Sequence, residues 1–409
     1  MSVAVKSEAP LARDDERACA DAYVLNPFAK LGFERLHDAT STRIYVVAPV
    51  RGRSWKRSAV AAHEQPRLFA LLRAMLTADA DVEVELPTED LEALREIGLL
   101  VASDDVPDEV RFHAALDACD AGLDDDGDAE DAIVHPSLSF DPPAGVEAAP
   151  APSGAGPMVW LTDARSGVAA PYEAGALEPA LRRCVPAAAP PPLAPLARAQ
   201  LRRAGVLVTR RELARAAAHR TVELTEANRR FADLSHAVVP ALVPPALLPE
   251  LQRYYAALVD EGHVLFGDSQ VPRRYVQHNE VVARMFLTAL TDTVQAVAGV
   301  ALKPAYAYFA SYREGARLEI HVDRPQCEVS VSLLLEYLPA SDGASPWPLW
   351  VSRTPDDEST RVAIHQRLGD GILYRGPELY HWRTPLPAGH RSTHLFLHYV
   401  RRDFQGSID

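Results

Sequence analysis

The stretch Arg317-Leu318-Glu319-Ile320-His321-Val322-Asp323 alternates apolar and polar residues, a pattern that indicates a β-strand. Successive residues of a strand point to opposite faces, so we expect His321 and Asp323 to project side by side from one face. An imidazole and a carboxylate in that arrangement can serve as adjacent ligands of a metal ion. A third candidate ligand, His381, comes 60 residues later (381 − 321), after a second strand-like segment at 369–374. The sequence therefore predicts a metal site of two histidines and one carboxylate.

Such a ligand set is typical of the ferrous sites of non-heme oxygenases, in which the remaining coordination positions stay open. A candidate for binding a second molecule follows ten residues after His381 (391 − 381). Arg391 and Thr393 are predicted to share a strand face, so a guanidinium and a hydroxyl can converge on one carboxylate. Arginine suits this role because its planar fork pairs with a carboxylate through two hydrogen bonds.

Taken as a set, these residues resemble the Fe(II)/2-oxoglutarate-dependent dioxygenase superfamily, and within it the prolyl-hydroxylase-like branch. The resemblance covers roughly residues 225–404 and includes segments similar to bacterial oxygenases of that branch, at 310–316, 321–327, 347–349, 374–376 and 381–383. The branch often has lysine at the position of Arg391, and arginine keeps the positive charge. The family implies a double-stranded β-helix, or jelly roll, and a reaction that requires Fe(II), 2-oxoglutarate and O2 and releases succinate and CO2.

The resemblance also implies roles for individual residues. The residues expected to bind iron and to form the catalytic centre are His321, Asp323 and His381. Arg391, assisted by Thr393, is expected to pair with the distal carboxylate of 2-oxoglutarate. Tyr312, nine residues before His321 (321 − 312), is expected to touch this cosubstrate. Two further tyrosines are candidates for the pocket mouth, Tyr306 and Tyr308.

Other polar residues near the expected ligands leave two interpretations open, namely binding of a substrate carboxylate or acidic peptide, and internal packing with ion pairs. These residues are Arg324, Arg375, Trp382 and Arg383. His394 and His398 lie four residues apart, but their apolar neighbours indicate a strand rather than a helical zinc motif. Cys327 precedes an apolar segment and is predicted to be buried.

Composition limits the kind of partner. The chain has 409 residues and a net charge of −14, which argues against a nucleic-acid partner because such a partner calls for a basic face.

No stretch reaches the eighteen or so apolar residues of a membrane span, and the N-terminal segment lacks an apolar signal core. The four cysteines are dispersed without disulfide or metal-binding spacing, so we expect a cytoplasmic protein.

Shifts in composition predict five parts: a tail at 1–25, a small α/β module at 26–115, an acidic and Pro/Ala-rich linker at 116–157, a second small α/β module at 158–220 and the oxygenase domain at 221–409. The acidic run in the linker does not match a calcium loop, because Gly122 and Ile133 stand where the loop requires Asp and Glu.

The two small modules share one feature. In both 94–101 and 201–208, a helical segment ends at glycine and turns into an apolar strand, which is the join found in small winged-helix units. The pair resembles the peptide-recognition modules of peptide natural-product pathways. Two interpretations stay open, because such modules can shield or position the catalytic domain, or can capture a peptide substrate.

The sequence as a whole predicts an α+β protein with a C-terminal jelly roll, buttressing helices and two winged-helix-like modules. Its expected activity is hydroxylation of a C–H bond in a peptide or amino-acid-derived small molecule of bacterial natural-product biosynthesis. Desaturation or cyclisation would use the same residues, whereas a halogenase is disfavoured because Asp323 fills the position that chloride needs. The alternative from another class is a peptide-binding or sensor protein whose oxygenase fold is catalytically idle.

Overall fold

The computed structural model describes residues 23–35, 42–51, 53–77, 88–112, 114–119, 131–143 and 157–408. By their internal contacts the residues form two units, and the first comprises 1–110 with 255–266, the second 111–254 with 267–409. The predicted second module and the predicted oxygenase domain thus share a unit. The other predicted boundaries stay predictions. Of the predicted tail at 1–25, residues 23–25 form strand β1, while residues 1–22 and the acidic run at 120–130 lie outside the described residues.

The first unit contains a three-stranded antiparallel sheet with two helices. Its buried core includes Ile44 and Val46 from the sheet and Leu72 and Leu94 from the helices. Gly98, at a φ of +77°, reverses the chain after the second helix, as the sequence predicted. The elements are β1 (Tyr23–Leu25), β2 (Lys30–Arg35), β3 (Thr42–Val50), β4 (Arg53–Ala61), α1 (Pro66–Thr77), α2 (Thr88–Glu96), β5 (Leu100–Ala102), η1 (Ser103–Asp105) and β12 (Leu265–Phe266).

The second unit begins with a comparable arrangement. Gly205, at a φ of +71°, joins a helix to an apolar strand, so the repeated helix–glycine–strand pattern is confirmed, while the winged-helix assignment stays a prediction. The elements here are β6 (Ala114–Ala115), η2 (Leu116–Ala118), β7 (Ala132–Val134), β8 (Met158–Thr162), β9 (Ala169–Glu173), η3 (Gly175–Leu177), α3 (Glu178–Leu181), α4 (Pro195–Arg203) and β10 (Leu207–Thr209).

Two features of this region differ from the sequence-based expectation. Part of the predicted linker is packed, because β7 pairs with β10 and buries Ile133 and Val134. The predicted boundary between residues 220 and 221 falls inside one helix, α5 (Arg210–Leu234). Neither glycine nor proline interrupts α5, and Thr209 and Glu212 close its first turn with a reciprocal capping box.

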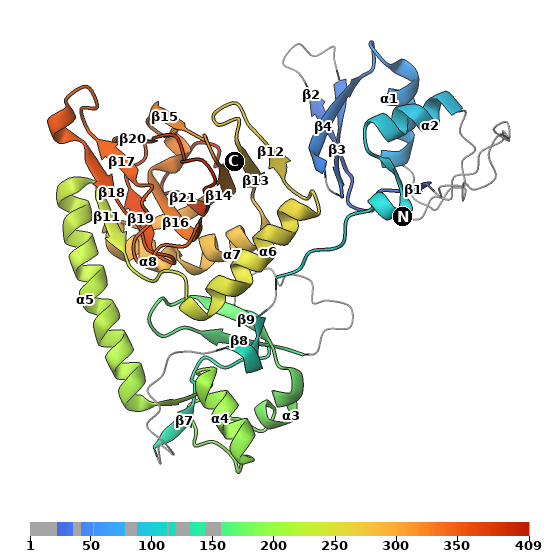
Figure 1. Ribbon diagram of the computed structural model, residues 1–409. Helices are drawn as coiled ribbons and strands as arrows, with labels where there is room; N and C mark the ends of the chain where they lie inside the picture. Colours follow the sequence, from blue (N-terminus) through green and yellow to red (C-terminus); the bar gives the residue numbers. More distant parts are fainter. Residues whose placement is uncertain are drawn as a thin grey trace. The chain divides into compact units, whose positions relative to one another are not determined.

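The C-terminal part of the second unit contains two antiparallel sheets (Figure 1). The larger sheet runs in the order β11-β19-β16-β21-β14-β13, and helices α7 and α8 lie against its β14 strand. The strands of this sheet are β11 (His236–Val239), β13 (Arg274–His278), β14 (Leu302–Arg313), β16 (Val329–Leu338), β19 (Gly371–Tyr374) and β21 (Arg391–Arg401). The helices before and beside them are η4 (Pro245–Leu247), α6 (Leu248–Asp260), α7 (Val281–Ala289) and α8 (Thr291–Ala298).

The smaller sheet has the order β15-β20-β17-β18 and carries the stretch with which the sequence analysis began. Leu349, Val351 and Ile364 of this sheet form one buried cluster with Ile372 and Tyr374 of the larger sheet. The two sheets therefore share a core, and the predicted mixture of helices and antiparallel strands is confirmed. The elements are β15 (Leu318–His321), η5 (Pro325–Cys327), β17 (Leu349–Ser352), η6 (Glu358–Thr360), β18 (Val362–Ile364) and β20 (Tyr380–Arg383).

In the part of the chain that the structure describes, no single helix is long and apolar enough to cross a membrane. The bent pair α7 and α8 meets the requirement only when its two helices are taken together, by length and composition alone.

Candidate metal centre

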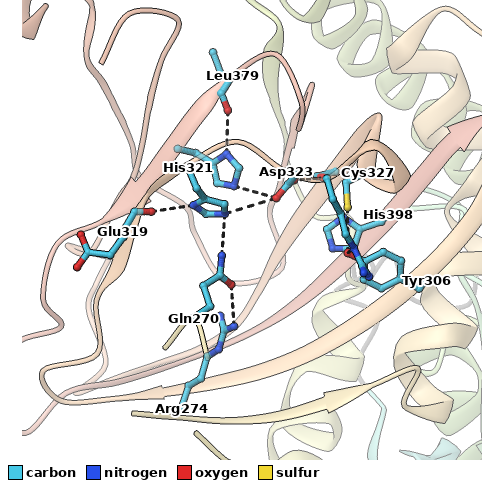
Figure 2. A network of polar contacts seen from close by, with 12 residues as sticks. Gln270, Arg274, Tyr306, Glu319, His321, Asp323, Cys327, Leu379 and His398 are labelled. Carbon is cyan, nitrogen blue, oxygen red and sulfur yellow. Dashed lines mark hydrogen bonds and ion pairs between the residues drawn. The ribbon is translucent and has the colours of Figure 1, made fainter. Parts of the chain in front are cut away.

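Two neighbouring strands bring the expected ligands together. His321 on β15 stands directly opposite His381 on β20, and the centres of their rings are 4.2 Å apart. Asp323 follows the end of β15, where its backbone N–H donates to the carbonyl oxygen of Gly376 at 2.9 Å. Its Oδ1 atom lies 3.4 Å from His381 Nε2 and 3.7 Å from His321 Nε2 (Figure 2). The three ligand atoms all lie within 4.8 Å of one another, so one metal ion can reach them together.

Backbone carbonyls orient both imidazoles. His321 Nδ1 lies 2.9 Å from the carbonyl oxygen of Glu319, and His381 Nδ1 lies 3.0 Å from that of Leu379. A carbonyl oxygen only accepts, so each Nδ1 must carry the proton and each Nε2 keeps a free lone pair. The side-chain amide of Gln270 lies 3.1 Å from His321 Nε2, where it can donate to that lone pair. A metal ion at this position would displace the Gln270 amide.

The protonation of Asp323 and His321 suits metal binding. Burial would raise the pKa of Asp323, but its close contacts with His381, His398 and Ser330 outweigh this effect and hold the pKa well below its usual range. The Ser330 hydroxyl also donates to Asp323 Oδ2 at 2.7 Å. Burial, followed by the nearby His381, lowers the pKa of His321. Metal ligands must be deprotonated carboxylates and neutral imidazoles, and the two pKa shifts favour these forms of Asp323 and His321.

A glycine makes room for the carboxylate. A Cβ atom at Gly376 would lie 2.5 Å from Asp323 Oδ2 and would also collide with the carbonyl oxygen of Cys327. Real Cβ atoms do not approach other atoms this closely, so any side chain at this position would push Asp323 away from the two histidines. The donor set and this close approach both fit a bound divalent metal of the iron type.

The three residues line a cavity of about 690 Å³, which also contains many aromatic side chains. Tyr312, the expected contact of the cosubstrate, lines its wall, and its hydroxyl accepts a hydrogen bond from Arg274 at 2.9 Å. Arg274 is itself paired with Asp268 at 2.7 Å, so its charge is balanced. Other aromatic residues of the wall, two of which were predicted at the mouth, are Tyr306, Tyr308, Tyr374 and Phe396.

Arg391 and Thr393 do not lie in this cavity. On β21 it is Phe396 and His398 that line the cavity, and the two-residue period of a strand turns Arg391 and Thr393 to the opposite face. There Arg391 pairs with Glu336 at 2.9 Å, and its side chain is 40% exposed. The two residues share a face, as predicted, but that face points away from the metal ligands.

Arg383, for which the sequence left two interpretations open, lies two residues after His381 on β20. It is 2% exposed and has no carboxylate partner among the described residues. One Nη donates to the carbonyl oxygen of Trp347 at 3.0 Å, the other has only a long contact of 3.5 Å with Gln366, and Nε has no partner. Burial lowers the pKa of Arg383 to about 10. The sequence indicated this position, because residues 381 and 383 are two apart on a strand and therefore share a face.

The buried guanidinium is close to the cavity wall. The guanidinium carbon of Arg383 lies 4.6 Å from the centre of the Trp347 ring, and that ring lies 5.2 Å from the ring of Tyr312. A fully buried cation without a counterion is costly, and it is stabilised when an anion arrives beside it. Arg383 does not itself line the cavity, so an anion would have to reach it beside Trp347 and Tyr312.

A second group of possible ligands adjoins the first and shares Asp323 with it. Atoms of Asp323, Cys327 and His398 also lie within 4.8 Å of one another. Burial raises the pKa of Cys327 to about 12, so its thiol stays protonated and binds metals poorly, and it contacts the Tyr306 hydroxyl at 3.1 Å. Cys327 is buried, as predicted, and His394 and His398 lie on strand β21 rather than on a zinc-binding helix.

Comparison with known proteins gave matches among solved structures alone. No family model matches the sequence, and no curated protein does. A prolyl-4-hydroxylase of Pseudomonas putida matches with 17% identity over 44% of this chain and 99% of its own, at a TM-score of 0.37. The α-ketoglutarate-dependent epimerase SnoN of nogalamycin biosynthesis matches with 12% identity over 44% of this chain and 82% of its own, at a TM-score of 0.37.

HygX of Streptomyces hygroscopicus, solved with nickel, 2-oxoglutarate and hygromycin B, matches with 13% identity over 44% of this chain and 88% of its own, at a TM-score of 0.35. These matches belong to the 2-oxoglutarate/Fe(II) oxygenase family, the one that the sequence motifs resemble. At such identities and TM-scores the matches carry no conclusion about the activity of this chain.

Proposed function

We propose that this protein is an Fe(II)- and 2-oxoglutarate-dependent oxygenase whose C-terminal sheets form a double-stranded β-helix. One observation carries the proposal: His321, Asp323 and His381 converge in a cavity with both Nε2 lone pairs free of backbone partners. The shared core of the two antiparallel sheets supports the jelly-roll assignment. A cavity of about 690 Å³ has the size of a small-molecule site.

The roles of the residues follow from their chemistry. His321, Asp323 and His381 would hold Fe(II) through two imidazoles and one carboxylate. Iron with 2-oxoglutarate and O2 supplies an oxidant strong enough to attack an unactivated C–H bond, with succinate and CO2 as coproducts. Asp323 stays anionic through its contacts with His381 and Ser330. The aromatic wall of the cavity would keep water away from the reacting centre.

We assign the distal carboxylate of 2-oxoglutarate to Arg383 in place of Arg391. The charge of Arg274 is already balanced by Asp268, and that of Arg391 by Glu336 on the other face of the sheet. Arg383 carries a buried charge without such a partner, so it would gain most from a carboxylate. Tyr312, between Arg274 and Trp347, remains a proposed contact of the cosubstrate.

The proposed reaction is hydroxylation of a peptide or an amino-acid-derived small molecule in bacterial natural-product biosynthesis, with desaturation and cyclisation as outcomes of the same chemistry. The N-terminal modules are proposed either to position the catalytic part or to hold a peptide substrate. We propose a cytoplasmic location, in keeping with the free thiols of Cys119, Cys184 and Cys327.

One observation favours the alternative of a catalytically idle sensor or peptide-binding protein. The Gln270 amide lies against His321 Nε2 and competes with a metal for that lone pair. A single hydrogen bond of this kind contributes only about 1 kcal/mol, far less than two imidazoles and a carboxylate gain from a divalent metal. The oxygenase proposal is therefore preferred.

The deciding experiment is anaerobic titration of the full chain with Fe(II) and 2-oxoglutarate. We expect a visible charge-transfer absorption band that requires both components, and succinate formation when O2 is admitted. Asp323→Ala should abolish the band, whereas Glu319→Ala, which removes an exposed carboxylate from the same segment, should keep it. An Asp323→Ala protein that binds Fe(II) as tightly as the parent would contradict the proposal.

A further inference from the structure

Arg324 is a guanidinium at the cavity that has no carboxylate partner in the described part of the chain. It directly follows Asp323, at the start of η5, and its side chain lines the cavity. Its Nε donates to the Tyr306 hydroxyl at 3.2 Å, and its guanidinium carbon lies 4.5 Å from the centre of the Tyr306 ring. Both of these contacts are to Tyr306, an uncharged side chain.

The position of the Arg324 guanidinium is fixed by a rigid aromatic group. The Tyr306 ring stacks on His278, with ring centres 5.0 Å apart, and packs against His398 at 4.4 Å. Tyr306 is thus held from both sides, and it holds Arg324 by a hydrogen bond and a cation–π contact. Arg324 is exposed, but these contacts direct it along the cavity wall, so it loses less entropy when it binds an anion than an unsupported arginine would.

The other charged groups of the cavity already have partners. Asp268 is paired with Arg274 and accepts from the Tyr308 hydroxyl. Asp323 belongs to the metal centre. By contrast with Arg324, the nearby Arg375 finds a carboxylate, that of Glu378, at 3.9 Å. The cavity therefore presents one unbalanced positive charge at Arg324.

Arg324 and Arg383 lie near residues at different ends of strand β14. Arg324 contacts Tyr306 of β14, and Arg383 packs on Trp347 beside Tyr312 of the same strand. Six residues of a β-strand span about 20 Å, at roughly 3.3 Å per residue. We therefore assign the two arginines to different molecules, with 2-oxoglutarate at Arg383 and another molecule at Arg324.

We infer that Arg324 binds a carboxylate of the substrate, next to the metal ligand Asp323, while the remainder of the substrate packs on the aromatic wall. The inference rests on the proposed oxygenase function and narrows its substrate class to carboxylic acids, such as an amino acid or the free C-terminus of a peptide. A carboxylate matches the single charge of one guanidinium, whereas a phosphate dianion calls for more than one unpaired cation.

The test uses the full chain with Fe(II) and 2-oxoglutarate under anaerobic conditions, and follows the shift of the charge-transfer band as probes are added. The probes are N-acetyl amino acids with aromatic or aliphatic side chains, each paired with its C-terminal amide, together with phenyl phosphate. We expect the acids to bind at least tenfold more tightly than the amides. Arg324→Gln should remove this difference and Arg324→Lys should keep part of it, with the Kd of 2-oxoglutarate unchanged in both.

Arg375→Gln is the matched control, because it removes a nearby arginine that already has a carboxylate partner, and it should behave as the parent does. If the band never forms, the oxygenase proposal itself fails. If the band forms but acids bind no better than amides, including the case in which neither binds, the assignment of Arg324 is wrong. Preference for phenyl phosphate, or loss of 2-oxoglutarate binding in Arg324→Gln, would likewise overturn it.

Discussion

At the scale of single residues, two arginines eight positions apart have opposite surroundings. Arg383 is buried without a counterion, whereas Arg391 is partly exposed and paired with Glu336. Charge-assisted hydrogen bonds contribute about 1.5–3 kcal/mol. We therefore expect Arg383→Gln to raise the Kd of 2-oxoglutarate by roughly tenfold to a hundredfold, and Arg391→Gln to change it less than about threefold, measured by titration of the charge-transfer band.

Substitution of Arg383 also distinguishes a role in ligand binding from a role in folding. Removal of an uncompensated buried charge relieves a desolvation cost, so Arg383→Met should leave the Tm of the ligand-free protein unchanged or raise it, while 2-oxoglutarate binding is lost. A lower Tm together with normal 2-oxoglutarate binding would show that Arg383 is a packing residue.

A buried histidine links the stability of the protein to pH. His394 is fully buried between Ser332 and Ser392, and burial holds its pKa well below the usual value. Below about pH 6.5 the unfolded chain takes up a proton at this residue and the folded chain does not, so stability falls as pH falls, by up to about 1.4 kcal/mol per pH unit. Urea unfolding between pH 7 and 5 should show a shallower loss for His394→Gln than for the parent.

The exposed His63 provides the control for this pH effect, because its side chain is 63% exposed. His63→Gln should retain the parent's loss of stability on acidification. Identical pH dependence in His394→Gln and the parent would exclude His394 as a source of the acid sensitivity.

At the scale of elements, the turn between β19 and β20 positions the metal ligand. A Cβ atom at Gly376 would meet Asp323 Oδ2 at 2.5 Å, whereas one at Gly343 would meet no atom within 4 Å. Gly376→Ala should therefore weaken Fe(II) binding by at least tenfold, because the carboxylate is pushed from the histidines. Gly343→Ala, the matched control, should bind as the parent does. The check is anaerobic Fe(II) titration of both variants after circular dichroism has shown that they fold, and equal Fe(II) affinities would contradict the proposed constraint.

The N-terminal cap of α5 stabilises that helix. Thr209 Oγ1 accepts from the backbone N–H of Glu212 at 3.1 Å, so Thr209→Ala should cost about 1 kcal/mol of unfolding free energy. Thr221 lies in the middle of the same helix and is exposed, and Thr221→Ala should be neutral or slightly stabilising because alanine has the higher helix propensity. Urea unfolding measures the unfolding free energy of both variants. If Thr209→Ala and Thr221→Ala change it equally, the Thr209 cap does not stabilise α5.

The alternation of residues predicted the arrangement of side chains on β15 but not on β21. The alternation at 317–323 predicted that His321 and Asp323 would lie together, and they do, although β15 ends at His321. On β21, however, both faces carry polar and apolar side chains, so alternation separates Arg391 and Thr393 from Ser392 and His394 without telling which set faces the metal. The packing of the strand against its neighbours decides this, and it is absent from any local pattern.

At the scale of the whole molecule, the two contact units have separate cores, and the metal ligands and cavity-lining residues all belong to the second. Two features missed from the sequence have different causes, one long-range and one local. The pairing of β7 with β10 joins residues that are more than seventy positions apart, and the acidic residues before β7 hide its short apolar run. By contrast, α5 continues across a change in composition because nothing in its sequence breaks a helix.

This division predicts that ligand binding stabilises the two units unequally. A ligand at a hundred times its Kd stabilises the species that binds it by about 2.7 kcal/mol. With Co(II), an oxygen-stable substitute for Fe(II), and 2-oxoglutarate, hydrogen exchange should slow in peptides of the second unit, especially 318–338 and 371–400. Peptides from 42–77 and 88–110 should exchange as before. Asp323→Ala should abolish the protection, because a metal held by two imidazoles alone loses its anionic ligand. Protection spread evenly over both units, or retained in Asp323→Ala, would mean that the ligands bind elsewhere than at this centre.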